Sequence, residues 1–364
     1  MSLMSIWLPA GVFLLTALLV RLLSVPAKKW DWVDQPSTRK HHTHPVPLVG
    51  GVAMWAAFVV GVLLLPEKPL DYPVMLGGMT LLVVVGLYDD LHHVHPRWRF
   101  VFQAGAVLLM GLAEHTRLEN LGNLFGLGNI QTGWIGGLFT MIAVIGVINA
   151  FNMIDGLDGL AGGLALIATG WMLTLCVSAP VLHASRANTL VLLMMVIAGF
   201  LIHNLRHPWR DRASSFMGDA GSTFLGFVIA WFAIRMSQDP TEAMDPVTAL
   251  WIMALPLIDT VTVMVRRIKA GESPFAADRQ HLHHMLLGLG LSDGKVVAIV
   301  LMAGVLLGGL GVVTQWLGVA EWQRFLAFIG LFVVYYLITT RMQKRKHMRP
   351  SQSGDRRISQ GSHQ

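Results

Sequence analysis

Apolar segments separated by short polar ones run along almost the whole chain. We count eleven segments of about 17 or more residues, a length that crosses a bilayer as a helix. Their predicted ranges are 6–25, 46–65, 70–88, 98–114, 132–150, 160–179, 188–204, 220–236, 247–267, 295–315 and 322–341. The pattern predicts an all-α polytopic membrane protein, with one transmembrane domain at 1–341 and a basic, disordered tail at 342–364.

Composition supports a membrane protein. The chain is 54% hydrophobic and 13% charged, whereas about a quarter of the residues in soluble domains are charged. The single cysteine, Cys176, lies in an apolar segment, so we expect neither a disulfide framework nor a cysteine metal site. Segment 6–25 lacks the basic start and the small-residue cleavage site of a signal peptide, so we predict a membrane helix there.

The distribution of basic residues predicts how the chain is oriented. If the eleven segments alternate in direction, most of the 27 Lys and Arg residues fall on one side of the membrane. By the positive-inside rule this side is cytoplasmic, which leaves the N-terminus outside and the C-terminus inside. The same distribution explains the net charge of +6 without nucleic acid as a partner, and it indicates attraction of the tail to lipid headgroups.

The stretch Asn149–Gly163, NAFNMIDGLDGLAGG, places amide and carboxylate side chains between two apolar segments. If it is helical, Asn152, Asp155 and Asp158 are spaced three apart and share one face. Such groups at the mouth of an apolar helix are costly unless they bind something. The glycines between them leave room for another group to approach the backbone. The alternative is a helix-capping loop, because Asn and Asp cap helices and Gly ends them.

Two further segments on the predicted cytoplasmic side carry carboxylates. In GLYDDLHH, Asp89 and Asp90 are adjacent and repel each other unless a cation lies beside them. In FMGDAGS, Asp219 precedes segment 220–236, where glycines permit close approach of a phosphate or a metal and a helix N-terminus attracts anions. A solvated loop and a plain N-cap are the alternative interpretations.

The segment at 266–284, RRIKAGESPFAADRQHLHH, combines cations with histidines. Arg267 can bind a diphosphate bidentately, and His281, His283 and His284 can donate to a phosphate or a leaving group. An ordinary basic loop is the alternative. Several Asp side chains without cysteine suit a hard cation with a phosphorylated ligand, so we expect Mg²⁺, with Mn²⁺ as the substitute.

Histidine is frequent enough to raise a rival hypothesis. HHTH, HHVH and HLHH lie on the predicted cytoplasmic side, and imidazole is the commonest transition-metal ligand. A His-rich zinc or nickel transporter is therefore the alternative function. Transport requires ionisable residues at mid-membrane, and Asp259 is the one carboxylate well inside a predicted span. The sequence assigns no role to Asp259, nor to the histidines of the first two clusters, His41, His42, His44, His92, His93 and His95.

Together these motifs resemble a known family. RKHHTHPVPLVGG, GLYDD, NAFNMIDGLDGLAGG, FMGDAGS and SPFAADRQHLHHMLL resemble the polyprenyl-phosphate N-acetylhexosamine-1-phosphate transferases, and especially the bacterial WecA type. The resemblance implies that undecaprenyl phosphate attacks UDP-N-acetylglucosamine in the bacterial inner membrane, on its cytoplasmic face. UMP then leaves, and the lipid-linked diphosphate sugar starts O-antigen or related polysaccharide synthesis.

The resemblance also implies roles for single residues. Asp219 would bind magnesium with the diphosphate, Asp89 would activate the lipid phosphate with Asp90 beside it, and His284 would join them in catalysis. Phe216 would stack on uracil. The residues implied in substrate binding are Arg39, Lys40, Asn152, Asp155, Asp158, Phe216, Arg267, His281 and His283.

The identity of the aminosugar, the number of chemical steps and the oligomeric state stay open at this point. HLHH stands where a related muramoyl-pentapeptide transferase has three consecutive histidines, which favours a simple aminosugar, but another UDP-N-acetylaminosugar remains an alternative. The family is compatible with a single displacement, which we favour, and with a two-step covalent route. It is also compatible with a homodimer.

Overall fold

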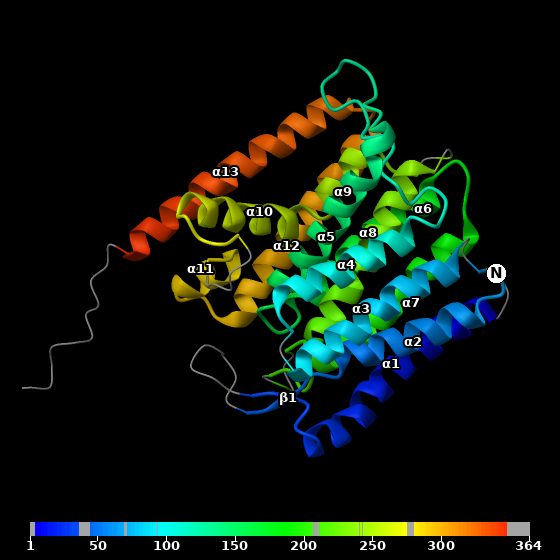
Figure 1. Cartoon of the computed structure of the whole chain (residues 1–364), viewed down its shortest axis with the longest axis vertical. Coiled ribbons are helices and arrows are strands. Elements are labelled where there is room, and N and C mark those ends of the chain that lie inside the picture. The colour runs from blue at the N-terminus through cyan, green and yellow to red at the C-terminus, as the bar shows by residue number, and fades with distance from the viewer. Residues whose placement is uncertain are drawn as a thin grey trace, which may run out of the picture.

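The computed structural model is mostly helical (Figure 1) and describes residues 4–35, 44–68, 71–92, 94–206, 210, 212–239, 241, 243–274 and 280–347. The helices are α1 (Met4–Lys29), α2 (Gly50–Leu64), α3 (Tyr72–His92), α4 (Pro96–Met110), α5 (Gly136–Ile154), α6 (Leu160–Ser178), α7 (Ala184–Asn204), α8 (Gly218–Gln238), α9 (Pro246–Ile252), α10 (Ala254–Lys269), α11 (Leu282–Gly288), α12 (Asp293–Trp316) and α13 (Glu321–His347). A 3₁₀ turn, η1 (Gly133–Ile135), precedes α5, and β1 (Val33–Asp34) pairs antiparallel with β2 (Val46–Pro47).

Each predicted span coincides with a helix or, at 247–267, with the bent pair of α9 and α10. Among the described residues, eight helices are long and apolar enough to cross a membrane, or nine if the bent pair is one span. α2 and α4 have 15 residues each, fewer than the roughly 17 to 25 of an ordinary span. The all-α, multi-span architecture is confirmed, while the number eleven and the orientation stay predictions.

The last helix is longer than the predicted last span. α13 ends at His347, so residues 342–347 continue the helix instead of belonging to the tail. The rest of the predicted tail, 348–364, lies outside the described residues.

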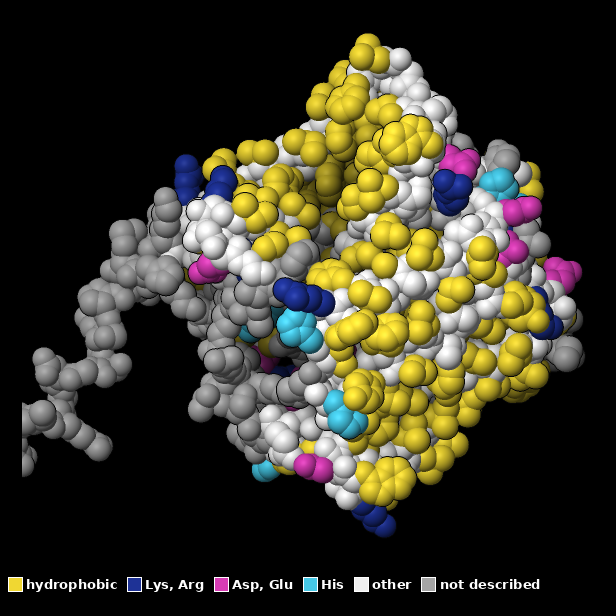
Figure 2. Space-filling model, viewed as in Figure 1, with side chains coloured by type: hydrophobic (Ala, Val, Ile, Leu, Met, Phe, Trp, Pro, Cys, Tyr) yellow, Lys and Arg dark blue, Asp and Glu magenta, His cyan; other side chains and the backbone are white. Residues whose placement is uncertain are grey.

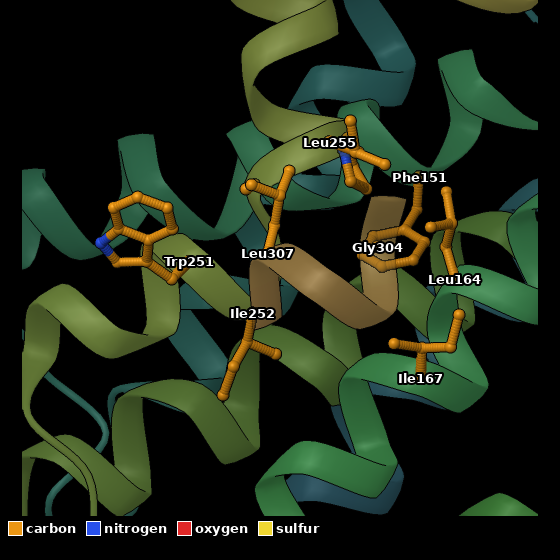
Figure 3. A pocket seen from close by; sticks show the side chains of 10 residues that line it. Phe151, Leu164, Ile167, Trp251, Ile252, Leu255, Gly304 and Leu307 are labelled. Carbon is orange, nitrogen blue, oxygen red and sulfur yellow. The ribbon is translucent and has the colours of Figure 1, made fainter. Parts of the chain in front are cut away.

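α9 and α10 meet at Met253 with a bend of 81°. Pro256 accounts for the break, because its ring would clash with the carbonyl of Ile252 if one helix ran through both. A narrow crevice lies beside the bend, between α5, α6, α9, α10 and α12 (Figure 3). The described residues that line it are all apolar, so this crevice offers no group for acid–base chemistry.

α8 is the central helix of the bundle (Figure 1). Every residue from Ala220 to Ser237 is buried, and α2, α3, α5 and α6 pack around the helix. Its sequence is apolar on nearly all sides, as expected of a helix without an exposed face. α8 therefore fixes the positions of its neighbours, and its first turn carries Asp219.

The contact between α3 and α8 depends on a glycine. A Cβ added at Gly86 would lie 2.5 Å from both the Cα and the N of Ala220, so the two backbones touch with no side chain between them. Gly86 lies about one helical turn before Asp89 and Asp90, on a side of α3 that they share. The contact therefore sets both carboxylates beside the N-terminus of α8.

The surface of the molecule is widely apolar. Figure 2 shows hydrophobic side chains spread over the middle of one face, with charged and histidine side chains toward its two ends. Large hydrophobic side chains are exposed on α1, α3, α4, α12 and α13. An apolar band of this kind is the surface expected to contact lipid.

Gly86→Ala tests the contact between α3 and α8. The added Cβ would push two backbones apart, and overpacking of this kind costs about 1–3 kcal/mol. We expect a clear drop in the apparent melting temperature of the protein in detergent. Gly77→Ala is the matched control, because it lies on the same helix and its added Cβ would meet no atom within 4 Å. Equal melting temperatures for the two variants would contradict the contact.

Candidate active site

A side chain from another helix caps the N-terminus of α8. Asp90 of α3 accepts hydrogen bonds from the backbone N–H groups of Asp219, at 2.8 Å, and Ala220, at 3.4 Å. The first N–H groups of a helix have no partners within it, and they attract a carboxylate. Gly218 permits this approach, because its φ is +68° and a Cβ there would overlap Asp90 Oδ2. Asp90 therefore holds the start of α8.

One guanidinium links the polar groups around this helix start. In the first turn of α4, Arg99 Nε lies 3.1 Å from Asp89 Oδ2, and its Nη1 lies 3.6 Å from Asp219 Oδ2. Its Nη2 donates to Asn152 Oδ1 at 2.9 Å. Asn152 Nδ2 donates in turn to Asp219 Oδ1 at 2.5 Å and to Ser222 Oγ at 2.9 Å. We call the following group the acid cluster: Asp89, Asp90, Arg99, Asn152 and Asp219.

The acid cluster holds three carboxylates and one guanidinium, so it favours a further cation. Carboxylate and amide oxygens suit Mg²⁺, which needs only one or two carboxylates when phosphate oxygens supply other ligands. Within the described parts of the chain, no group of three or more His, Cys, Asp or Glu residues is arranged to hold a metal by itself. The donor set therefore fits a magnesium ion whose coordination a phosphorylated ligand completes.

The three polar residues predicted on one helix face do not share one. α5 ends at Ile154, so Asp155 and Asp158 lie in the turn that follows, and only Asn152 joins the acid cluster. Asp158 accepts from Arg206 Nε at 2.8 Å and from a backbone N–H of the segment before α8. The helical interpretation is wrong here because the glycine-rich turn ends α5, and Asp158 ties that turn to neighbouring chain.

Asp155 has a pKa close to neutral pH. Its side chain is partly buried, and this burial, together with the negative charges of Asp219 and Asp158, raises its pKa to about 7. A cation bound at the acid cluster would favour the ionised carboxylate. Asp155 is therefore electrostatically coupled to Asp219, although it lies in a different segment.

The histidines around α11 lie against the turn after α5. Gly156 permits this, because a Cβ on it would overlap the ring of His283. The buried His283 ring lies 5.9 Å from that of His281 and 4.2 Å from that of His284, measured between ring centroids. Gly156 thus leaves room for the ring of His283. Through His283, the row of three rings contacts the turn that carries Asp155.

Comparison with known proteins identifies the family. The family model described as glycosyl transferase family 4 matches residues 72–237. The chain is 36% identical over 333 residues to the undecaprenyl-phosphate alpha-N-acetylglucosaminyl 1-phosphate transferase of Escherichia coli O157:H7, with 89% of this chain and 88% of the relative covered. The chain belongs to glycosyl transferase family 4.

Other relatives agree with this assignment. Proteins of the same name from Pasteurella multocida and Haemophilus influenzae are each 36% identical to the chain. The matches cover 91% and 90% of this chain, and 91% and 92% of the relatives. The resemblance found in the sequence motifs is confirmed, and this family member is a membrane phosphoglycosyl transferase.

Other residues that the family resemblance assigns to substrate contact neighbouring parts of the chain or lie outside the described residues. Arg267 is buried, and its Nη1 donates to the carbonyl of Pro274 at 2.7 Å, so it holds the chain that follows α10. The partly exposed Phe216 stands just before α8, and its backbone N–H donates to the carbonyl of Pro47. Arg39 and Lys40 lie outside the described residues, and their roles stay predictions.

The histidine clusters HHTH and HHVH contribute local contacts where they are described. His95 caps α4, because its Nδ1 accepts from the backbone N–H of Arg97. The ring of His92 stacks on Tyr88 with centroids 4.5 Å apart. His41, His42 and His93 lie outside the described residues. Helix capping and ring stacking account for His95 and His92 without a metal.

Arg99 is the main residue that the sequence analysis missed. A signal was present, because a helix N-terminus repels cations, yet Arg97 and Arg99 both lie in the first turn of α4. That cost points to a negative group nearby. Ser222 offered no comparable signal, since serine in an apolar helix usually bonds to its own helix backbone; here it also donates to the Gly218 carbonyl.

Arg99→Gln tests whether the guanidinium offsets the charges of the acid cluster. Without it, Asp89 and Asp219 repel each other, so we expect a lower melting temperature in chelator. Magnesium should then raise the melting temperature of the variant more than that of the unmodified protein, because the ion binds a more negative site. The exposed Arg97→Gln, in the same helical turn, is the control. An identical magnesium response in all three proteins would contradict this role.

Proposed function

We propose that this family member transfers N-acetylglucosamine 1-phosphate from UDP-N-acetylglucosamine to undecaprenyl phosphate. An oxygen of the lipid phosphate attacks the β-phosphorus, the bond to the α-phosphate breaks, and UMP leaves. The lipid-linked diphosphate sugar then enters O-antigen or related surface polysaccharide synthesis. The names of the relatives support the sugar and the lipid.

The acid cluster is the observation that carries the proposal. It lies at one end of the bundle, where α3 and α5 end and α4 and α8 begin. A water-soluble nucleotide sugar and a phosphate at the membrane surface can meet at such a place. Both substrates are anions, so positioning and charge stabilisation supply most of the catalysis in phosphoryl transfer.

The chain's own residues have distinct tasks in this proposal. Asp219 and Asp89 hold Mg²⁺, which when bound offsets the negative charge of the two phosphorylated substrates. Asn152 orients Asp219 through its hydrogen bond. Arg99, which already contacts both carboxylates, is placed to attract a phosphate oxygen. Asp90 keeps α8 in place, and this assigns it a positioning task instead of a catalytic one.

The membrane arrangement belongs to the same proposal. We propose that the protein lies in the bacterial cytoplasmic membrane with eleven spans, its N-terminus outside, and its acid cluster on the cytoplasmic side. The positive-inside pattern supports this orientation, because the basic connecting segments include those at the helix ends that form the cluster.

The alternatives differ in how far they depart from this reaction. Another UDP-N-acetylaminosugar would use the same acid cluster, and only its sugar contacts would differ. The transition-metal transporter is disfavoured by family membership.

A transfer assay tests the proposal. Protein purified in detergent is given undecaprenyl phosphate and labelled UDP-N-acetylglucosamine, with magnesium or with chelator. We expect label in the organic phase only with magnesium, and a loss of at least about 100-fold for Asp219→Asn, since it removes a charge at the metal. UDP-N-acetylgalactosamine as an unlabelled competitor tests the aminosugar.

The control is Glu67→Gln, which changes an exposed carboxylate between α2 and α3, outside the acid cluster. It should retain full transfer. The proposal fails if no lipid product forms with magnesium, and the assignment of the metal fails if chelator leaves transfer unchanged.

A further inference from the structure

The buried carboxylate of Asp259, to which the sequence assigns no role, has three donors from two other segments of the chain. His281 Nδ1 lies 2.7 Å from its Oδ2. The backbone N–H of Leu282 donates to its Oδ1 at 3.0 Å, and the hydroxyl of Tyr335 donates to the same oxygen at 2.7 Å. Asp259 is 2% exposed. A carboxylate this well buried and this fully hydrogen-bonded holds its donors in fixed positions.

The contact with Asp259 determines how His281 presents its other nitrogen. Because a carboxylate accepts only, Nδ1 carries a proton in this contact, and Nε2 is the second functional atom of the ring. Within the described chain, Nε2 of His281 has no hydrogen-bond partner. An imidazole held by a carboxylate through one nitrogen is well suited to bind a ligand through the other.

Tyr335 brings the last helix into this arrangement. α13 lies along the side of the bundle (Figure 1), and much of its surface is exposed. Its residue Tyr335 nevertheless reaches Asp259, and Thr339, one turn later, contacts the guanidinium of Arg266. α13 thus holds both α10 and, through Asp259, the start of α11.

His281 belongs to the row of rings that meets the active site. Its ring is nearly parallel to that of His283, with an angle of 7° between the planes, and His283 fills the space above Gly156. The orientation of His281 therefore carries over to the histidines beside the turn that bears Asp155. Asp259 lines one narrow crevice with His283 and with Ile154 and Leu160, which flank that turn.

We propose that Asp259 and Tyr335 are positioning residues for the transfer reaction. They hold His281 so that, with Nδ1–H toward Asp259 and a second proton on Nε2, the ring donates from Nε2 to a phosphate oxygen of the substrate during transfer. This inference rests on the proposed function and adds two residues to it, one of them on the last helix. No bond to Asp259 or Tyr335 forms or breaks; both act through the hydrogen bonds that orient the imidazole.

Steady-state kinetics of four variants test the proposal. Asp259→Asn removes the negative charge that stabilises a doubly protonated His281 ring, so kcat should fall about 10- to 100-fold while KM for UDP-N-acetylglucosamine changes little. Asp259→Glu keeps the carboxylate and should recover part of that loss. Tyr335→Phe removes one hydrogen bond and should lower kcat up to about tenfold. Tyr336→Phe is the matched control, because its hydroxyl contacts Lys269 and not Asp259; its kcat should be unchanged.

A double variant separates positioning from folding. In a His281→Asn background, Asp259→Asn should cause no further loss of kcat, since the residue it orients is gone. Melting temperatures of all variants are measured in parallel.

The inference is overturned if Asp259→Asn lowers kcat as much in the His281→Asn background as in the unmodified protein. It is also overturned if Tyr336→Phe lowers kcat as much as Tyr335→Phe, or if each loss of kcat follows a loss of folded protein. Absence of transfer by the unmodified protein would instead refute the proposed function.

Discussion

The enclosure of three carboxylates at one end of a helical bundle is the constraint on which the site depends. Asp89, Asp90 and Asp219 come from two helices whose backbones touch at Gly86, so they cannot move apart without separating α3 from the central helix. Like charges this close are unfavourable unless each has a counter-charge or donors. The N-terminus of α8 supplies donors for Asp90, and Arg99 supplies the positive charge for the other two.

Side chains next to the acid cluster are also held by groups from other segments. The guanidinium that offsets the charges also fixes Asn152, and a glycine in the turn after α5 leaves space for His283. Beside the histidines, Asp259 is held by Tyr335 from the last helix. Asp90, Asn152 and Asp259 are thus each held by a partner from a distant segment, which lets an apolar bundle present a rigid polar surface at one end.

Periodicity and residue type predict some of this architecture and not the rest. Runs of apolar residues locate the helices because each must bury its backbone polar groups, and Asp89, Asn152 and Asp219 stand out because charge and amide groups are costly beside such runs. Partners cannot be predicted in this way. Asp158 looks equivalent to Asn152 in sequence, yet the end of α5 turns it toward Arg206. Arg267 looks like a phosphate ligand, and nothing in the sequence shows that its Nη1 also donates to the carbonyl of Pro274.

A double-mutant cycle between Arg99 and Asp219 tests the central claim, that one guanidinium offsets the repulsion between the enclosed carboxylates. The apparent melting temperatures of the unmodified protein, Arg99→Gln, Asp219→Asn and the double variant are measured in detergent with chelator. If the charges are coupled, the double variant melts higher than Arg99→Gln alone, because removing one carboxylate relieves the repulsion that the lost guanidinium had offset. Losses that simply add would contradict the account and leave Arg99 as an ordinary surface cation.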